Sequence, residues 1–302
     1  MRNSMKIGII GTDTSHSIAF TELLNDRNHR YHVQGGEVIA AYPGGSPDFE
    51  LSISRVAGFA EQMSSGYGVR IVDSPAQVAE VSDAILLLSA DGRVHRELFE
   101  EIAPYGKPVF IDKPLALSLN EAGAIADLAR LRQLPVMSSS SLRYAEALTK
   151  QIGSHPSEDA VIGVECYAPM FMEPTQTGYY WYGIHAVEML YAILGSGCIS
   201  VLASVSGDQE TIVGVWRSGA VGTIRGSRSG GYPFAAAIHR ERQSSFVYVP
   251  AEEKPFYASL LEQVMRMFET GVPAVPLEAT LEVIRFIEAA NESRKTGETV
   301  DL

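Results

Sequence analysis

The segment Lys6–His16, with the sequence KIGIIGTDTSH, decides how this chain folds. Its first five residues, Lys6–Ile10, form a short apolar run that ends at Gly11, as expected of a buried strand. Ser17–Asn25 follows with Ile18, Leu23 and Leu24 as its apolar residues, which predicts a helix. A strand, a glycine turn and a helix in this order form the first half of a βαβ unit.

The pattern of strands and helices continues through the first half of the chain. We expect further strands over Glu37–Ala41, Val69–Val72, Ala84–Ser89, Pro108–Ile111 and Pro135–Ser138. We expect helices over Ile53–Met63, from Ser74-Pro75 onward, and over His95–Ile102 and Ser118–Leu131. Such alternation predicts an α/β fold, a Rossmann-like parallel sheet with helices on both faces, whose ligands bind beyond the carboxyl ends of the strands.

The pattern changes after about Lys150. Strands with β-branched and aromatic residues are expected over Val161–Ala168, Ile199–Ser206, Thr211–Trp216, Ala220–Gly226 and Ser245–Val249. Helices are expected over Tyr182–Leu194, Phe256–Thr270 and Leu277–Lys295. These elements predict a second, α+β domain with an antiparallel sheet and helices on one side. We place the domain boundary between residues 145 and 146, giving domains 1–145 and 146–302.

Composition excludes several classes of protein. The chain has 302 residues, of which 46% are hydrophobic and 20% charged, as in ordinary globular proteins. No apolar run reaches the roughly 18 residues of a membrane span, and the N-terminus lacks the pattern of a signal peptide, so we expect a cytoplasmic protein. The net charge of −12 disfavours nucleic acid and membrane surfaces as partners. Cys166 and Cys198 are expected to be reduced core thiols.

The glycine turn departs from the pattern G-x-G-x-x-G that binds dinucleotides. In Gly11-Thr12-Asp13-Thr14-Ser15-His16 only the first glycine is present, and Asp13 and His16 replace the other two. A carboxylate at position 13 would repel phosphates unless its side chain turned away. A turn that only caps the next helix explains these residues equally well. The second strand ends in Ala40-Ala41-Tyr42, without an acid for the ribose of NAD or an Arg for the phosphate of NADP, so both cofactors stay open.

Five further segments carry a resemblance to a known family. They are Gly106–Ala116 (GKPVFIDKPLA), Ser89–His95 (SADGRVH), Ser140–Arg143 (SSLR), Gly183–Glu188 (GIHAVE) and Ser293–Leu302 (SRKTGETVDL). In this order along the chain they resemble the glucose–fructose oxidoreductase / inositol dehydrogenase / MocA family. The resemblance implies an N-terminal dinucleotide-binding Rossmann domain. It also implies a C-terminal substrate domain whose open antiparallel sheet packs in dimers or tetramers.

The resemblance further implies an oxidoreductase that transfers hydride between NAD or NADP and a sugar, polyol or related carbonyl compound. Lys113 and His185 would sit at the substrate carbinol. His185 suits the role of base, because its ordinary pKa is near neutrality, and Lys113 could stabilise the developing alkoxide. The residues expected to bind the cofactor are Gly11, Thr12, Asp13, Thr14, Ser15, His16, Ser89, His95, Asp112 and Lys113. No metal site is expected, because the histidines lack ligand spacing.

Two departures concern catalysis. Asp112 replaces the glutamate of the family's Glu-Lys-Pro, and Trp181 stands four residues before His185, where active members usually carry Asp. Glu188, three residues after His185, could partly replace that acid as a catalytic residue. Tyr180, Trp181 and Tyr182 could form a stacking platform for a sugar ring, or a core cluster, and Arg143 is a further candidate for substrate binding.

Two alternatives therefore stay open beside the oxidoreductase. One is a redox-inactive family member that acts as a ligand-binding or regulatory protein, suggested by Asp13, His16 and Trp181. The other is a sugar lyase or hydrolase that works without net redox change.

Overall fold

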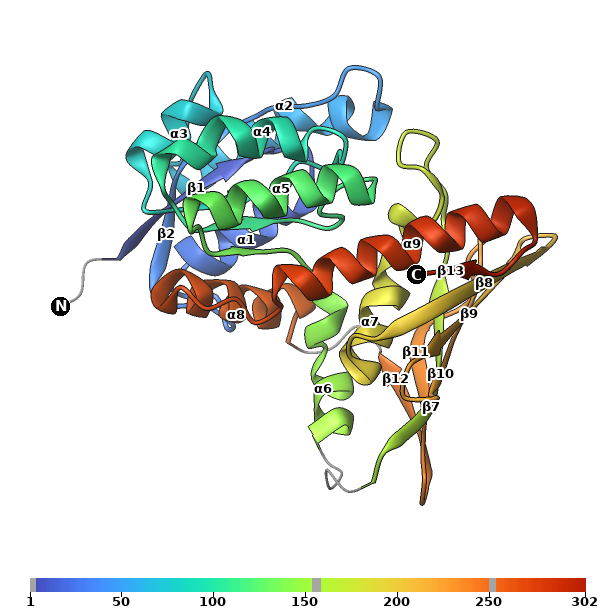
Figure 1. The fold of residues 1–302 in the computed structure, drawn as a ribbon. Helices are drawn as coiled ribbons and strands as arrows, with labels where there is room; N and C mark the ends of the chain where they lie inside the picture. Colours follow the sequence, from blue (N-terminus) through green and yellow to red (C-terminus); the bar gives the residue numbers. More distant parts are fainter. Residues whose placement is uncertain (1–3, 154–158, 250–253) are drawn as a thin grey trace. The chain divides into compact units, whose positions relative to one another are not determined.

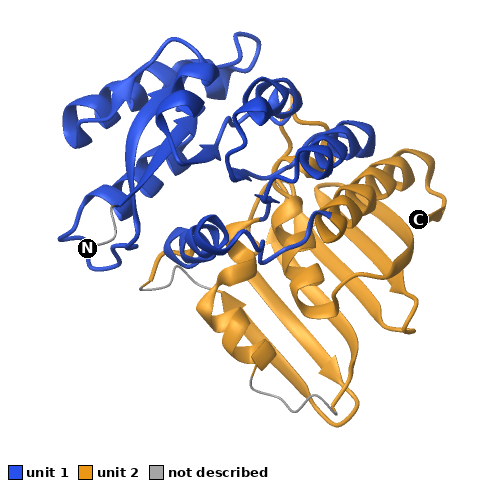
Figure 2. Ribbon diagram, turned by 60° about the vertical axis from the view of Figure 1, so that its left-hand side comes forward, with its two compact units in different colours: residues 1–139, 257–277 blue, residues 140–256, 278–302 orange. Residues whose placement is uncertain are grey.

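A computed structural model describes residues 4–153, 159–249 and 254–302. The chain forms two compact units: residues 1–139 with 257–277, and residues 140–256 with 278–302 (Figure 2). The predicted domains 1–145 and 146–302 stay a prediction. The compact units differ from them because the chain returns to the first unit at Tyr257 and leaves it at Leu277.

The first unit contains a six-stranded parallel sheet with the strand order β3-β2-β1-β4-β5-β6 (Figure 1). The strands are β1 (Met5–Ile10), β2 (Gly36–Tyr42), β3 (Arg70–Ile71), β4 (Ala84–Leu87), β5 (Val109–Ile111) and β6 (Val136–Met137). The order reverses at β1, so the carboxyl ends of β1 and β4 flank a topological switch point, where such sheets bind ligands. The predicted Rossmann-like fold is confirmed.

The helices of this unit begin where the sequence supplies caps. They are α1 (Ser15–Asn25), α2 (Glu50–Tyr67), α3 (Pro75–Val81), α4 (His95–Ile102), α5 (Leu119–Arg132) and, from Tyr257 on, α8 (Phe256–Thr270), with a 3₁₀ turn at Ala103–Tyr105. The side chains of Thr14, Ser74 and Ser118 accept hydrogen bonds from the first turns of α1, α3 and α5. Helix α1 packs against α2, while α3, α4 and α5 pack side by side.

The second unit contains a seven-stranded sheet with the order β12-β11-β7-β10-β9-β8-β13. Its strands are β7 (Val161–Pro169), β8 (Cys198–Ser206), β9 (Gln209–Trp216), β10 (Val221–Ser227), β11 (Phe234–Arg240), β12 (Ser244–Val249) and β13 (Val300–Asp301). Neighbouring strands run antiparallel, as predicted, except for the parallel pair β7 and β10. Strands β11 and β13 were not predicted from the sequence, and it is pairing with β11 that makes β7 an interior strand of the sheet.

Helices cover one face of this second sheet. They include α7 (Ile184–Leu194), which contacts β7 and β10, and α9 (Leu277–Thr296), whose Phe286 ring meets Trp216 of β9. Helix α6 (Glu146–Gly153), also missed, and the 3₁₀ turns Ser141–Tyr144 and Gly178–Tyr180 complete the unit. The other face of the sheet, here called the open face, carries no helix from the described residues of this unit (Figure 1). That face carries exposed apolar side chains, among them Leu202, Val215, Val221, Phe246 and Tyr248.

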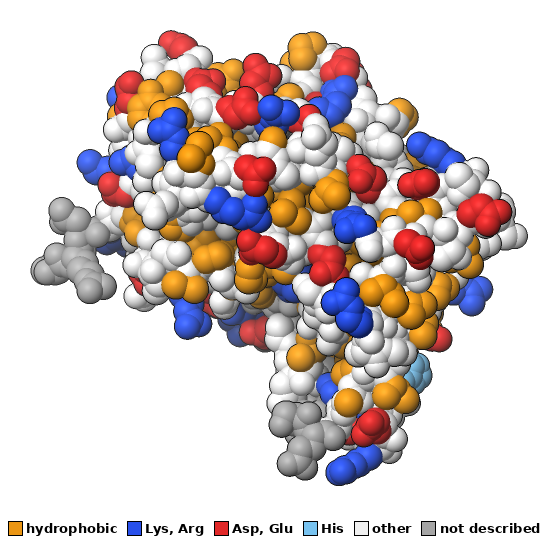
Figure 3. Space-filling view, in the orientation of Figure 1, with side chains coloured by type: hydrophobic (Ala, Val, Ile, Leu, Met, Phe, Trp, Pro, Cys, Tyr) orange, Lys and Arg blue, Asp and Glu red, His pale blue; other side chains and the backbone are white. Residues whose placement is uncertain are grey.

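Charge and burial agree with a globular chain. Acidic and basic side chains are interspersed on the face shown in Figure 3. Cys166 and Cys198 are buried free thiols, as predicted, and burial raises the pKa of both, that of Cys198 to about 11. Among the described residues, no helix is both long and apolar enough to cross a membrane.

The glycine that ends β1 yields a first prediction. Gly11 has a φ of +92°, and a Cβ added to it would lie 2.4 Å from the backbone nitrogen of Ser89. Gly11→Ala should therefore destabilise the protein by more than ~1 kcal/mol. Gly58 lies in the exposed middle of α2 with open space around it, so Gly58→Ala should leave stability unchanged or raise it by about 0.5–1 kcal/mol. Urea unfolding of both variants measures this contrast, and equal effects would contradict it.

Candidate functional site

The turn after β1 is held in place by backbone hydrogen bonds to the segment after β2. The backbone nitrogens of Gly11 and Thr12 donate to the carbonyl oxygens of Tyr42 (2.9 Å) and Pro43 (2.8 Å). Thr12 also donates its hydroxyl to the carbonyl of Val56, in α2, at 2.9 Å. The turn thus opens directly into the N-terminus of α1, where helix geometry favours anions.

Asp13 turns away from this opening. Its side chain is fully buried, and its Oδ2 accepts a hydrogen bond from Ser52 Oγ (2.5 Å) while Oδ1 accepts one from the backbone nitrogen of Ala90 (3.1 Å). Burial raises the pKa of the Asp13 carboxyl, and the two hydrogen bonds oppose that shift. The carboxylate therefore does not face the position of a bound phosphate, which was the objection that the sequence raised. With this carboxylate directed away from its opening, the turn fits a dinucleotide.

His16 contacts the end of β5. Its Nδ1 lies 2.5 Å from Oδ2 of Asp112, and its ring packs against Tyr257 of α8, with ring centroids 4.6 Å apart. Asp112 Oδ1 accepts a hydrogen bond from the backbone nitrogen of Lys113 (2.9 Å). Burial would raise the pKa of Asp112, but the imidazole of His16 and the ammonium of Lys113 outweigh it and hold the pKa below its ordinary value. For Lys113, burial lowers the pKa, and the charge of Asp112 opposes this.

His95, expected to bind cofactor, is fully buried at the start of α4. Its Nε2 faces the carbonyl oxygen of Ser89 (2.8 Å), and its Nδ1 faces that of Pro114 (2.9 Å). Both ring nitrogens are therefore occupied by backbone. This placement supports a structural role, in which His95 joins the segments that follow β4 and β5.

A cavity of about 230 Å³, here called the strand-end cavity, lies beyond the carboxyl ends of β1, β2 and β4. Gly11, Tyr42, Gly44, Gly45 and Ser89 line it from the strand ends, and Pro75, Val94, Glu97, Leu98 and Glu101 line it from α3 and α4. Its walls combine apolar side chains with polar groups, as ligand cavities do. Its place in the sheet is where a dinucleotide's adenosine half is bound in Rossmann folds.

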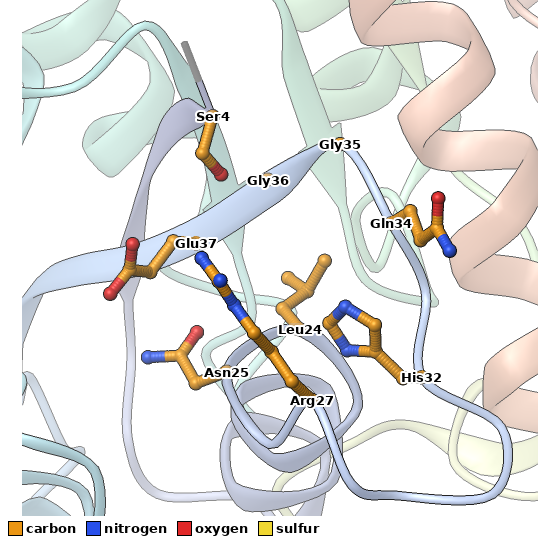
Figure 4. A pocket seen from close by; sticks show the side chains of 9 residues that line it. All are labelled: Ser4, Leu24, Asn25, Arg27, His32, Gln34, Gly35, Gly36 and Glu37. Carbon is orange, nitrogen blue, oxygen red and sulfur yellow. The ribbon is translucent and has the colours of Figure 1, made fainter. Parts of the chain in front are cut away.

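A larger cavity, of about 370 Å³, opens at the other end of the same sheet (Figure 4). Ser4, Gly36 and Glu37 from the start of β1 and β2 line it together with Asn25, Arg27 and His32 around the end of α1. Asn25 is already used: its side chain exchanges two hydrogen bonds with the backbone of Val38. Since parallel sheets bind ligands at their carboxyl ends, this cavity is not the candidate cofactor site.

In the second unit, His185 lies in the first turn of α7 among aromatic rings. Its Nδ1 lies 2.7 Å from the hydroxyl of Ser140. The rings of Tyr182 and Phe234 meet the imidazole edge-on at centroid distances of 5.2 and 5.8 Å, and Phe171 packs on Tyr182 at 5.1 Å. Ser140 thus contacts the imidazole, and no acid at position 181 is needed to orient its Nδ1.

The other candidates of the second unit differ in burial: two of them are buried and two are partly buried. Glu188 is buried, and its Oε2 accepts a hydrogen bond from Nε of Arg143 at 2.6 Å, so this carboxylate pairs with Arg143. Tyr180 is also buried and donates its hydroxyl to the carbonyl of Ile284, which does not support the expected role in substrate binding. Trp181 is only partly buried, as is Tyr182.

Sequence reasoning missed part of this cluster. Ser140 opens the SSLR segment that was noticed, but nothing in that segment pointed to His185, which lies 45 residues further along the chain. Phe171 and Phe234 lie in stretches without a motif. Only their aromatic side chains, in segments around the predicted helix start, could have pointed to these two residues. Such a pattern is a weak indication of a site. Among the described residues, no group of three or more His, Cys, Asp or Glu could hold a metal.

Taken unit by unit, the structure defines a dinucleotide-binding Rossmann fold followed by an α+β unit. Residues 5–140 match the model of an oxidoreductase family with an NAD-binding Rossmann fold, the family named for glucose–fructose oxidoreductase, inositol dehydrogenase and MocA. The match covers the parallel sheet of the first unit, and the resemblance seen in the sequence is confirmed there. Among curated proteins, none matches this chain.

Solved structures resemble the chain over nearly its full length. A probable dehydrogenase from Thermotoga maritima has a TM-score of 0.78 at 19% identity, covering 98% of this chain and 99% of its own. The myo-inositol 2-dehydrogenase from Lactobacillus plantarum has a TM-score of 0.79 at 15% identity, covering 99% and 100%. The myo-inositol dehydrogenase from Lactobacillus casei, solved with NAD(H) and myo-inositol, has a TM-score of 0.75 at 17% identity, covering 99% and 97%. At these identities the likeness shows the fold.

Asp13 yields a prediction for the pH dependence of stability. Because its pKa in the folded chain is raised, the folded state binds more protons than the unfolded state between the ordinary pKa, 3.8, and the raised one. The contribution of Asp13 to stability therefore falls as pH rises through that window. Relative to Asp13→Asn, the wild type should gain stability as pH is lowered from about 7 toward about 4.

Urea unfolding across this pH range measures the effect, with Asp73→Asn as the control because Asp73 is exposed. The difference between the wild type and Asp73→Asn should not follow the same trend. If the wild type instead lost stability relative to Asp13→Asn as the pH is lowered, burial would not raise the pKa of the Asp13 carboxyl, and the prediction would be wrong.

Proposed function

We propose that this protein is an NAD(P)-dependent oxidoreductase that acts on a sugar, a polyol or a related carbonyl compound. The observation that carries the proposal is the orientation of Asp13, whose carboxylate is bonded to Ser52 and Ala90 and so leaves the turn after β1 open to a pyrophosphate. The residues assigned to the cofactor are Gly11, Thr12, Thr14, Ser15, His16, Ser89, Asp112 and Lys113. Asp13 acts behind this turn by shaping it.

In this proposal His185 is the general base. When bound, the nicotinamide cofactor supplies the acceptor or donor of hydride. A carbinol hydroxyl must lose its proton as the carbon is oxidised, and an imidazole is suited to accept it near neutral pH. Ser140 is a positioning residue, because its hydroxyl contacts Nδ1 of the imidazole at 2.7 Å. Glu188, assigned in the sequence as a catalytic residue, acts through Arg143 and is better described as a positioning residue.

Lys113 is assigned the stabilisation of the developing alkoxide. Burial lowers the pKa of its ammonium, so the proton is held less tightly and can be shared with the substrate oxygen. For substrate binding we retain Tyr182, Trp181 and Arg143. The rings of Tyr182, Phe171 and Phe234 offer apolar faces to the C–H side of a sugar ring.

The second candidate is a redox-inactive family member that binds a ligand. The short contact between His16 and Asp112 favours this alternative. The contact joins the turn after β1 to the end of β5, and so it occupies two residues that are also assigned to the cofactor. Asp13 no longer argues for this alternative. A sugar lyase or hydrolase is the third reading, and it predicts product formation without added cofactor.

Binding and turnover distinguish these readings. Titration with NADH and NADPH should show binding by the proposed enzyme, and sugars and inositols should then change the absorbance of the reduced cofactor. His185→Asn should lower kcat by about 10²- to 10⁴-fold while leaving the Kd for NADH within about twofold. His29→Asn serves as the control, because His29 has no assigned role and its Nδ1 accepts a hydrogen bond from the backbone nitrogen of Tyr31. Absence of binding by either dinucleotide at millimolar concentration would remove the proposal.

We further propose a cytoplasmic homo-oligomer, a dimer or tetramer, formed through the open face of the second sheet. Alternate residues of β8, β9, β10 and β12 put apolar side chains on that face, with exposed fractions from 36% for Val215 to 63% for Phe246. An apolar surface of this kind that no helix covers within its unit marks an interaction site.

Charged substitutions on this face test the oligomer. Leu202→Glu combined with Phe246→Glu should shift the sedimentation coefficient toward the monomer, because burying carboxylates in an apolar interface is costly. Leu131→Glu is the matched control, since Leu131 is 78% exposed on α5 of the first unit. A wild-type protein that sediments as a monomer at micromolar concentration would refute the proposed interface.

A further inference from the structure

The charges around the strand-end cavity bear on the choice between NAD and NADP. Two glutamates of α4, Glu97 and Glu101, which are both exposed to solvent, are among its lining residues, and these include no Lys or Arg. Within the part of the chain that the structure describes, the Glu97 carboxylate makes no hydrogen bond or ion pair. Oε1 of Glu101 accepts one hydrogen bond, from the backbone nitrogen of Ala76 (3.2 Å). The cavity therefore offers acceptors for hydroxyl groups and repels anions.

The guanidinium of Arg93, which lies next to the cavity wall in the sequence, already donates hydrogen bonds to two carboxylates. Arg93 directly precedes Val94 in the cavity wall, but its Nε and Nη2 donate to Asp91 at 2.7–3.0 Å. Its Nη1 and Nη2 also donate to the carboxylate of Asp48, both at 2.7 Å. The Asp91 side chain is completely buried. Moving Arg93 to a ligand phosphate would break its ion pair with that buried carboxylate, which is unfavourable.

This arrangement differs from the usual Rossmann pattern. There, an acid that ends the second strand binds the ribose hydroxyls of NAD. Here β2 ends at Tyr42, and Pro43-Gly44-Gly45 follow, with no carboxylate. The acids of the cavity come instead from a helix that follows β4. Gly44 and Gly45 line the cavity on the β2 side, and as glycines they bring no charged side chain to it.

We infer that Glu97 and Glu101 select NAD over NADP by accepting hydrogen bonds from ribose hydroxyls and repelling a 2′-phosphate. The inference rests on the proposed function, because it concerns the same cofactor site. A 2′-phosphate carries between one and two negative charges at neutral pH, and like charges in contact lower affinity by tenfold or more. The adenine ring has the apolar surfaces of Pro75, Val94 and Leu98 to pack against.

Calorimetric titration of the full-length protein with NADH and with NADPH tests the inference. The wild type should bind NADH at least about tenfold more tightly than NADPH. Glu97→Gln combined with Glu101→Gln should reduce that ratio at least threefold, mainly by raising the affinity for NADPH. Glu100→Gln is the matched control, because Glu100 lies on the same helix, pairs with Arg96 and does not line the cavity.

The outcomes separate the inference from the proposed function. Equal affinities, tighter binding of NADPH, or an equal loss of preference in Glu100→Gln would overturn the inference and leave the oxidoreductase intact. Failure of both dinucleotides to bind would contradict the proposed function. A second arm uses the adenosine half alone. AMP should raise the melting temperature more than adenosine 2′,5′-bisphosphate does, and the reverse order would overturn the inference without reference to activity.

Discussion

The buried carboxylate of Asp13 is the interaction on which the first unit's binding edge depends. It joins three segments: its own turn after β1, Ser52 of α2 and the backbone of Ala90 after β4. An unpaired carboxylate in this position would cost several kcal/mol, so the two hydrogen bonds specify where the three segments must lie. Because the side chain is directed inward, the mouth of the turn holds backbone groups and the N-terminus of α1, which favour an anion.

A second buried carboxylate organises the same edge. Asp91 forms an ion pair with Arg93, and Arg93 forms a second ion pair with Asp48, which lies between β2 and α2. The hydrogen bonds of Arg93 keep the pKa of Asp48 below its ordinary value. Together with Asp13, this ion-pair chain connects the segments after β1, β2 and β4. A site that must hold a ligand in one geometry needs such support behind its lining residues.

The limits of sequence reasoning are visible at particular residues. Helix α4 begins at His95 and ends at Ile102, as predicted, because its apolar spacing and flanking turns are local signals. Strand β11, with the sequence FAAAIHR, escaped because its small residues do not show the β-branched alternation on which the analysis relied. The direction of Asp13 could not be predicted, because its partners lie 39 and 77 residues further along the chain. The contact between Ser140 and His185 and the ion pair between Arg93 and Asp48 could not be predicted either, because each joins residues 45 positions apart in the sequence.

These long-range contacts change how a degenerate motif should be interpreted. The second glycine of G-x-G-x-x-G allows the backbone to approach a pyrophosphate, and a side chain there obstructs it only if it points outward. In this chain an inward-pointing aspartate meets the same requirement, and Ser52 supplies the hydroxyl that makes burial of its charge tolerable. The third position, His16, is likewise directed at Asp112 instead of at solvent. The chain therefore lacks two glycines of the sequence pattern G-x-G-x-x-G but keeps an open turn after β1. The turn stays open because the side chains of Asp13 and His16 point away from it.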